Sequence, residues 1–316
     1  MKTVFLLFDS LNRLALSPWG GNIVTPNFER FSEKSISFNT HYVASLPCMP
    51  ARRDLHTGRL NFLHRSWGPL EPFDQSFPEI LKNNGCYTHL ITDHYHYWED
   101  GGATYHNRYS SWDFVRGQEW DNWKAIVNPP KEKFIKKYHP LQSDVSNQKR
   151  LQGMINREFM KEEKDYSIVQ CIQRGLEFLD LNRSFDNWFL QLECFDPHEP
   201  FFAPERFREL YPTGYNGPVL NWPKYQKVLE TEKEVEEIRA NYAALVSMCD
   251  EYFGKILDYF DTHNLWKDTA LIVSTDHGFM LAEHGWWAKS RMPFYEEISH
   301  IPLMIYHPKF KNKSGV

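Results

Sequence analysis

The chain has 316 residues, of which 41% are hydrophobic and 24% are charged, a composition typical of a globular protein with one large α/β domain. Its formal net charge of −5 argues against a nucleic-acid-binding surface, which needs a concentration of basic side chains. No apolar run approaches the roughly 18 residues that span a membrane. We therefore expect neither a nucleic acid nor a membrane as a partner.

The cysteines and the N-terminal residues indicate the cellular compartment in which we expect the protein. The five cysteines are widely spaced and odd in number, without the paired spacing of zinc sites: Cys48, Cys86, Cys171, Cys194 and Cys249. Reduced thiols fit this pattern best. The N-terminal apolar run ends at Asp9 and is too short for a signal peptide. The sequence as given predicts a cytoplasmic protein.

Apolar runs and helix-boundary residues predict strands alternating with helices. In chain order we expect a strand at 4–8, helices at 27–32 and 77–83, strands at 88–92 and 188–194, and further elements beyond them. A helix at 167–179 precedes the strand at 188–194, and a long amphipathic helix at 232–260 is followed by strands at 270–274 and 301–306. This alternation predicts an α/β fold with a mostly parallel central sheet and helices on both faces.

Residues 93–165 break this pattern, being rich in Tyr, Trp, Gly, Asn and charged residues with weak periodicity. Long irregular segments within a domain are often functional. We expect residues 1–316 to form one catalytic domain, with 93–165 as an insertion over the active site. Its aromatic side chains make a ring-shaped substrate plausible.

Several polar residues directly follow buried apolar runs. Asp9 follows the first predicted strand, His198 follows the strand at 188–194, and Asp276 and His277 follow the strand at 270–274. In a parallel sheet the carboxyl ends of the strands share one edge, where ligands bind. We therefore expect these side chains to converge.

The segment from Cys48 to Gly58 reads CMPARRDLHTG. Pro50 suits the first turn of a helix, so Cys48 would lie at a helix N-terminus, where free N–H groups favour an anion. Arg52 lies one turn further and is able to face the same group. This segment resembles the sulfatase signature C-x-P-[SA]-R-x4-T-G at every fixed position.

Two further segments resemble sulfatase motifs. Residues 274–289 are similar to the S-D-H-G segment of that family, in which Asp276 and His277 match metal ligands and Lys289 matches the lysine that contacts the sulfate. Residues 196–200, DPHEP, are similar to the segment whose histidine, here His198, faces the leaving group. The resemblance extends from residue 1 to about 308. Sulfatases usually continue into a smaller C-terminal subdomain, which we expect to be absent or truncated here.

The resemblance implies a sulfuric-ester hydrolase of the alkaline phosphatase superfamily, closest in pattern to choline sulfatases and phosphonate monoester hydrolases. It implies that Cys48 is oxidised to formylglycine (3-oxoalanine) by a formylglycine-generating or anaerobic sulfatase-maturating enzyme. Cys48, Arg52, His198 and Lys289 would be catalytic. Asp9, Cys48, Asp276 and His277 would hold one divalent metal ion, which we leave open between calcium or magnesium and, because of the imidazole, manganese or zinc. The substrate would be a small-molecule or saccharide sulfate ester.

The sequence departs from the usual sulfatase pattern at two places. Ser10 follows Asp9 where many members have a second aspartate. The residues 93–96, namely Asp93, His94, Tyr95 and His96, replace a segment whose Lys and His usually touch the sulfate. We keep all four as candidate substrate contacts.

Two alternatives stay open. A phosphonate monoester hydrolase or phosphodiesterase on the same fold would use a similar site, because a phosphate diester and a sulfate monoester carry the same single negative charge. A catalytically inactive, carbohydrate-binding relative would use the aromatic segment at 93–123 without turnover.

Overall fold

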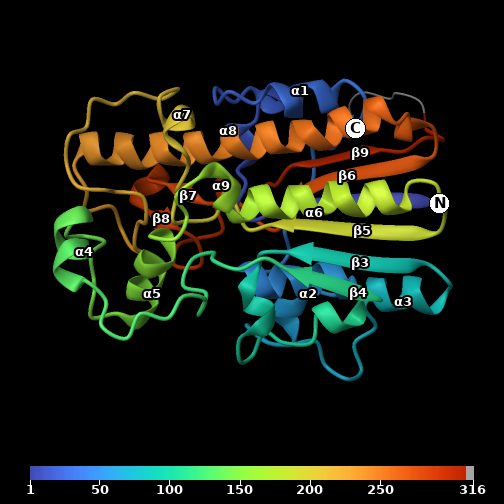
Figure 1. The fold of residues 1–316 in the computed structure, drawn as a ribbon, viewed down its shortest axis with the longest axis horizontal. Coiled ribbons are helices and arrows are strands. Elements are labelled where there is room, and N and C mark those ends of the chain that lie inside the picture. Colours follow the sequence, from blue (N-terminus) through green and yellow to red (C-terminus); the bar gives the residue numbers. More distant parts are fainter. Residues whose placement is uncertain (311–316) are drawn as a thin grey trace.

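A seven-stranded sheet forms the centre of the computed structural model, which describes residues 1–310 (Figure 1). Its strand order is β2-β9-β6-β1-β5-β3-β4. The strands are β1 (Lys2–Phe8), β2 (Ile36–Ser37), β3 (Tyr87–Thr92), β4 (Ser111–Phe114), β5 (Trp188–Cys194), β6 (Thr269–Thr275) and β9 (Leu303–Tyr306). All neighbours pair in parallel except β2 with β9 and β9 with β6. The predicted mostly parallel sheet is confirmed.

Helices cover both faces of this sheet (Figure 1). They are α1 (Pro26–Ser32), α2 (Cys48–Thr57), α3 (Phe77–Asn83), α4 (Lys131–Lys137), α5 (Gln148–Arg157), α6 (Ser167–Asn182), α7 (Glu205–Arg208), α8 (Glu232–Thr262) and α9 (Glu296–Ser299). The helices α1, α6 and α8 share one hydrophobic core with the sheet, and α2 and α3 pack on the other core. A small hairpin of β7 (Met280–Leu281) and β8 (Trp287–Ala288) follows β6.

The first strand shows why a continuous apolar run forms a central strand. Val4, Leu6 and Phe8 belong to the core beneath α1, α6 and α8, whereas Phe5 and Leu7 belong to the opposite core. Because successive side chains of a strand point to opposite faces, a strand covered on both faces needs apolar residues at every position. This arrangement places Asp9 at the carboxyl edge of the sheet.

A side chain of α8 fixes the start of α1. The Asp250 carboxylate accepts hydrogen bonds from the backbone N–H of Phe28 at 2.8 Å and of Asn27 at 3.0 Å. The N-cap residue of α1, Thr25, makes no side-chain cap bond. The first-turn N–H groups that a helix leaves unpaired are therefore satisfied from another element.

Residues 93–165 are more regular than the sequence predicts. Within them, β4 pairs in parallel with β3 and extends the central sheet, and α4 and α5 form two further helices. The sequence does not predict β4 because this strand is short and lies at the edge of the sheet. Trp112 is exposed there, and no continuous apolar run is needed. Figure 1 shows α4 and α5 at the end of the molecule to which the arrows of β3 and β5 point.

Among residues 1–310, no helix has both the length and the apolar character needed to cross a membrane. The long helix α8 begins instead with a capping box, in which Thr231 and Glu234 satisfy each other's backbone N–H groups. Its many buried residues face the core that it shares with α1 and α6.

Candidate active site

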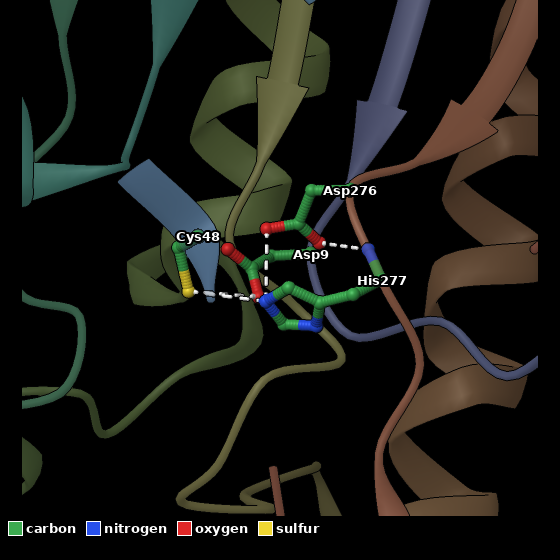
Figure 2. Close-up of side chains that lie close together, drawn as sticks. All are labelled: Asp9, Cys48, Asp276 and His277. Atoms are coloured by element: carbon green, nitrogen blue, oxygen red, sulfur yellow. Dashed lines mark hydrogen bonds and ion pairs between the residues drawn. The ribbon is translucent and has the colours of Figure 1, made fainter. Parts of the chain in front are cut away.

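Four predicted site residues meet at the carboxyl edge of the sheet. Asp9 follows β1, Asp276 and His277 follow β6, and Cys48 begins α2. All four are buried, and one ligand-capable atom from each lies within 4.8 Å of the others (Figure 2). The Cys48 Sγ lies 3.8 Å from Asp9 Oδ1 and 3.4 Å from His277 Nε2. The expected convergence is observed.

Ser10 links the two strand ends that carry the carboxylates. Its backbone N–H donates to Asp276 Oδ1 at 3.1 Å, and its hydroxyl donates to Asp9 Oδ1 at 2.8 Å. Its φ of 61° lies in the left-handed region that non-glycine residues seldom adopt. In this structure Ser10 therefore holds both aspartates in place, where many relatives have a second aspartate.

The Arg52 guanidinium connects three buried carboxylates. Its Nη2 donates to Asp9 Oδ2 at 3.0 Å, its Nη1 to Asp276 Oδ2 at 2.5 Å, and its Nε to Glu193 Oε1 at 2.5 Å. All four side chains are buried. Glu193 lies within β5 and has no counterpart among the predicted site residues. The signal that could have identified Glu193 is a charged residue inside a strand that is mostly apolar.

Lys289 approaches the same centre from the segment after β8. Its Nζ lies 2.8 Å from Ser10 Oγ, 3.5 Å from Cys48 Sγ and 3.6 Å from Asp9 Oδ1. The side chain is 1% exposed. Although burial lowers the pKa of Lys289, the neighbouring Cys48 and Asp9 raise it above its ordinary value, so the ammonium group stays charged. Arg52 and Lys289 thus provide two positive charges beside position 48.

The two histidines at the sheet edge present Nε2 to the site. His277 Nδ1 lies 3.0 Å from the carbonyl oxygen of Gly278, and His198 Nδ1 lies 2.6 Å from that of Glu199. A carbonyl only accepts, so each Nδ1 carries the proton and each Nε2 keeps its lone pair. Burial, followed by the charge of Lys289, lowers the pKa of both imidazoles well below its ordinary value. His277 is therefore in the neutral form that binds metals.

The two carboxyls and the thiol differ in their charge states. Burial raises the pKa of Asp9, but Lys289 and Arg52 outweigh burial and hold it well below its ordinary range. Burial and then the charge of Asp9 raise the pKa of Asp276 to about 7. The same two causes raise the pKa of the Cys48 thiol well above its ordinary value. The unmodified Cys48 is therefore a protonated thiol and a poor nucleophile.

This donor set fits a divalent metal ion. Protein ligands lie roughly 2.0–2.6 Å from the ion, so atoms on opposite sides of it are up to about 5 Å apart. The mutual separations within 4.8 Å satisfy that limit. Asp9 and Asp276 supply carboxylate oxygens, His277 supplies an imidazole nitrogen oriented through Gly278, and position 48 supplies a fourth group.

The four candidates at 93–96 behave differently from one another. The carboxyl of Asp93 accepts hydrogen bonds from Phe195 N at 2.6 Å and from Gln118 Nε2 at 3.1 Å, so it is engaged within the fold. His94 lies 3.8 Å from Asp9 Oδ2, and neither of its ring nitrogens has a hydrogen-bond partner within residues 1–310. Tyr95 donates to Glu119 Oε2 at 2.7 Å, and His96 Nδ1 lies 2.6 Å from Glu99 Oε2.

A second group surrounds His198. Glu119, His198 and Glu199 are buried, with one ligand-capable atom from each within 4.8 Å of the others. The sequence pointed to His198 but not to the two glutamates. Glu119 lies far from His198 along the chain, and Glu199 appears in the sequence only as one position of the DPHEP segment.

The sheet order, the buried group of candidate metal ligands and the position of Cys48 at a helix N-terminus define an α/β protein with a candidate metal site at the carboxyl edge of its sheet. The chain belongs to the sulfatase family, whose model, described as Sulfatase, matches residues 2–314. This match spans nearly the range from residue 1 to about 308 over which the sequence resembles that family and continues to residue 314.

Curated relatives include choline-sulfatase of Rhizobium meliloti (strain 1021), 27% identical over 90% of this chain and 58% of the relative. Iduronate 2-sulfatase of Homo sapiens is 24% identical over 98% of this chain and 60% of its own length. The chain thus spans about three-fifths of the length of these relatives.

Solved structures share the fold. The phosphonate monoester hydrolase of Agrobacterium radiobacter superposes with a TM-score of 0.73 at 17% identity, covering 97% of this chain and 68% of the other. That of Silicibacter pomeroyi also gives 0.73, at 19% identity, covering 100% of this chain and 70% of the other. The expected alkaline-phosphatase-like architecture is confirmed.

Proposed function

We propose that this protein hydrolyses a sulfate ester through a formylglycine that is derived from Cys48. One observation carries the proposal: Cys48 Sγ, at the N-terminus of α2, lies within 3.8 Å of Asp9 Oδ1, His277 Nε2 and Lys289 Nζ. A side chain at this point is next to the metal-ligand set on one side and to a fixed cation on the other.

The modification is chemically necessary in this proposal. Oxidation of Cys48 to the aldehyde, and its hydration, would supply one hydroxyl as the nucleophile and a second hydroxyl whose deprotonation releases sulfate. Cys48 is 2% exposed. The enzyme that oxidises it, either formylglycine-generating or anaerobic sulfatase-maturating, therefore has to act before this region folds.

The metal ion would be held by Asp9, Asp276, His277 and the group at position 48. When bound, it would supply positive charge that lowers the pKa of a hydroxyl and stabilises negative charge on the sulfuryl oxygens. Carboxylates favour calcium or magnesium, and the imidazole shifts the preference toward manganese or zinc.

The other side chains bind the substrate anion and move protons. Arg52 fixes the orientation of Asp9 and Asp276, and Lys289 places its ammonium group 3.5 Å from Sγ of Cys48, where it neutralises a sulfuryl oxygen. Lys289 carries a proton that it is able to give to the departing alcohol, whereas the neutral His198 would first have to gain a proton at Nε2. A protonated His198 would donate from Nε2, because its Nδ1 proton is held by the carbonyl of Glu199.

Mass spectrometry of the peptide that contains residue 48 tests the proposal. Conversion of Cys to formylglycine lowers the peptide mass by roughly 18 Da through loss of sulfur and two hydrogens and gain of one oxygen. We expect hydrolysis of an aryl sulfate to scale with the fraction of converted peptide. Full activity in a preparation that contains only the thiol form would overturn the mechanism.

A phosphonate monoester hydrolase is the second candidate function. The pairing of Asp9 with Ser10, and of Asp276 with His277, matches the pattern that sets phosphonate monoester hydrolases and choline sulfatases apart within the family. Paired assays with 4-nitrophenyl sulfate and 4-nitrophenyl phenylphosphonate separate the two functions. A higher kcat/KM for the phosphonate ester would favour the second candidate.

A further inference from the structure

The carboxylates of Glu119 and Glu199 lie beside the proposed reaction centre and have no role in the reaction described above. They flank His198, and the three side chains are 2%, 0% and 3% exposed in the order Glu119, Glu199, His198. Two carboxylates in a water-excluded site are costly unless positive charge compensates them. Burial raises the pKa of both carboxyls, so their charged forms need a cation beside them.

Glu199 lacks such a partner within the part of the chain that the structure describes. Neither carboxylate oxygen has a hydrogen bond of normal geometry, and burial raises the pKa of the Glu199 carboxyl although Lys289 and the Tyr225 phenol act to lower it. His198 Nδ1 lies 3.2 Å from Glu199 Oε2, but its proton is directed to the backbone oxygen of Glu199. Glu119 has one donor, the hydroxyl of Tyr95.

The surrounding cations are committed elsewhere. Lys289 is within electrostatic reach of both glutamates, but its Nζ is bonded to Ser10 and close to Cys48. Arg150 donates to the carbonyl oxygen of Trp222, and Arg157 donates to Met160 and Gln118. Among residues 1–310, the two carboxyls therefore have only the distant charge of Lys289 to compensate them.

Aromatic rings border the same position. The ring of Tyr95 lies 6.0 Å from that of Trp120, the residue next to Glu119, and Trp120 stacks on Trp222 at 6.3 Å. Lys149 Nζ lies 4.5 Å from the ring centroid of Trp120, and the Arg150 guanidinium lies 4.6 Å from that of Trp222, so these rings already attract cations. Carboxylates and aromatic rings together suit a positively charged, partly apolar group.

We propose that Glu119 and Glu199 bind an ammonium group, either a protonated amine or a quaternary nitrogen, on the alcohol half of the sulfate ester. The inference rests on the proposed function. Lys289, beside Cys48, would face the sulfate, and the two glutamates lie beside His198, which would face the departing alcohol. This order of charges complements a zwitterionic ester and repels an alcohol that carries a carboxylate or a second sulfate.

An isosteric pair of substrates tests the inference. Choline sulfate and 3,3-dimethylbutyl sulfate have the same shape, but carbon replaces the charged nitrogen in the second. We expect kcat/KM for choline sulfate to exceed that for the neutral ester by about tenfold or more. Equal values, or a preference for the neutral ester, would overturn the inference.

Variants test whether the two glutamates cause the preference for the charged ester. In Glu199→Gln and Glu119→Gln, which keep the side-chain shape, the ratio between the two esters should fall toward one. Glu158→Gln, which removes a partly exposed carboxylate that pairs with Lys137, should keep the wild-type ratio. A ratio that stays at the wild-type value in both site variants would contradict the assignment of these residues.

Binding measurements separate this inference from the proposed function. Calorimetry with choline and with 3,3-dimethylbutan-1-ol requires no turnover, so it tests cation binding even if no sulfate ester is hydrolysed. Tighter binding of choline that is lost in Glu199→Gln supports the inference. Loss of one equivalent of bound metal in Glu199→Gln, with no choline binding by the wild type, would mean that the cluster holds a metal ion instead.

Discussion

Arg52 Nε lies 2.5 Å from Glu193 Oε1, so an arginine of α2 is held in place by a glutamate of β5. The other two nitrogens of the guanidinium bond to Asp9 and Asp276. Tyr97 adds a donor to Glu193, at 3.1 Å from Oε2. Glu193 therefore fixes the plane of the group that orients both carboxylates of the metal centre.

We expect Glu193→Gln to act through Arg52. Gln keeps the shape but removes the charge that compensates a buried guanidinium, so the free energy of unfolding should fall by about 2–4 kcal/mol. The kcat/KM for an aryl sulfate should fall roughly tenfold to a hundredfold. Urea denaturation and steady-state kinetics measure the two effects. Glu177→Gln, which alters an exposed residue of α6, should change neither. Unchanged activity in a stable Glu193→Gln protein would contradict this role.

His277→Ala should weaken metal binding. The substitution removes the only imidazole of the ligand set while leaving Asp9 and Asp276 in place. We expect more than a tenfold loss of affinity, measured by competition with a chromogenic chelator, and a shift of preference from zinc and manganese toward calcium. His284→Ala is the matched control, because His284 belongs to the same segment but is exposed and lies beside Glu297. Equal loss in both variants would show that His277 is not a ligand.

The sequence predicts the central elements of this fold well because they are buried on both faces. The limits of β5 agree with the expected strand at 188–194, and β1 extends the expected strand by two residues at its start. By contrast, β2 and β4 are short and only partly buried, so their sequences carry no long apolar run. A run of apolar residues in the sequence indicates a buried strand. A short strand at the edge of the sheet buries few of its side chains and therefore has no such run.

The site divides in the same way. Cys48 and Arg52 are one helical turn apart, so their relationship is local and visible in the sequence. The contact between Glu119 and His198 depends on the path of residues 93–165, which no local pattern specifies. Asp93 shows the opposite case: a motif position suggested a substrate contact, but its side chain direction places the carboxyl against Phe195 N.

Asp250→Ala should destabilise the protein through α1. The substitution removes the acceptor for the first-turn N–H groups of Asn27 and Phe28, and these groups lie where water replaces it poorly. We expect the free energy of unfolding to fall by about 1–3 kcal/mol. Asp258→Ala, also on α8, breaks an exposed ion pair with Arg30 and should cost less than about 1 kcal/mol. Chemical denaturation compares the two, and equal losses would rule out the capping role.

His56 should make the protein less stable in acid. Its ring lies on α2 between Phe77 and Tyr105, at centroid distances of 5.3 and 5.1 Å, and neither nitrogen has a hydrogen-bond partner within residues 1–310. Burial, with a smaller effect of Arg52, lowers the pKa of His56 to about 3. The unfolded chain binds this proton near the ordinary pKa of about 6.5, whereas the folded chain does not.

The sign follows from that difference in bound protons. Between pH 6.5 and about 3 the unfolded state holds more protons, so the stability contributed by neutral His56 is complete above pH 6.5 and is lost as the pH falls. The loss approaches about 1.4 kcal/mol per pH unit. In His56→Phe, which fills the same aromatic site without a titrating group, the decrease in unfolding free energy from pH 7 to pH 4 should be smaller by about 3 kcal/mol. His64→Phe, at an exposed position, should follow the wild type. Parallel pH profiles for the wild type and His56→Phe would show that His56 is not the residue whose protonation drives acid unfolding.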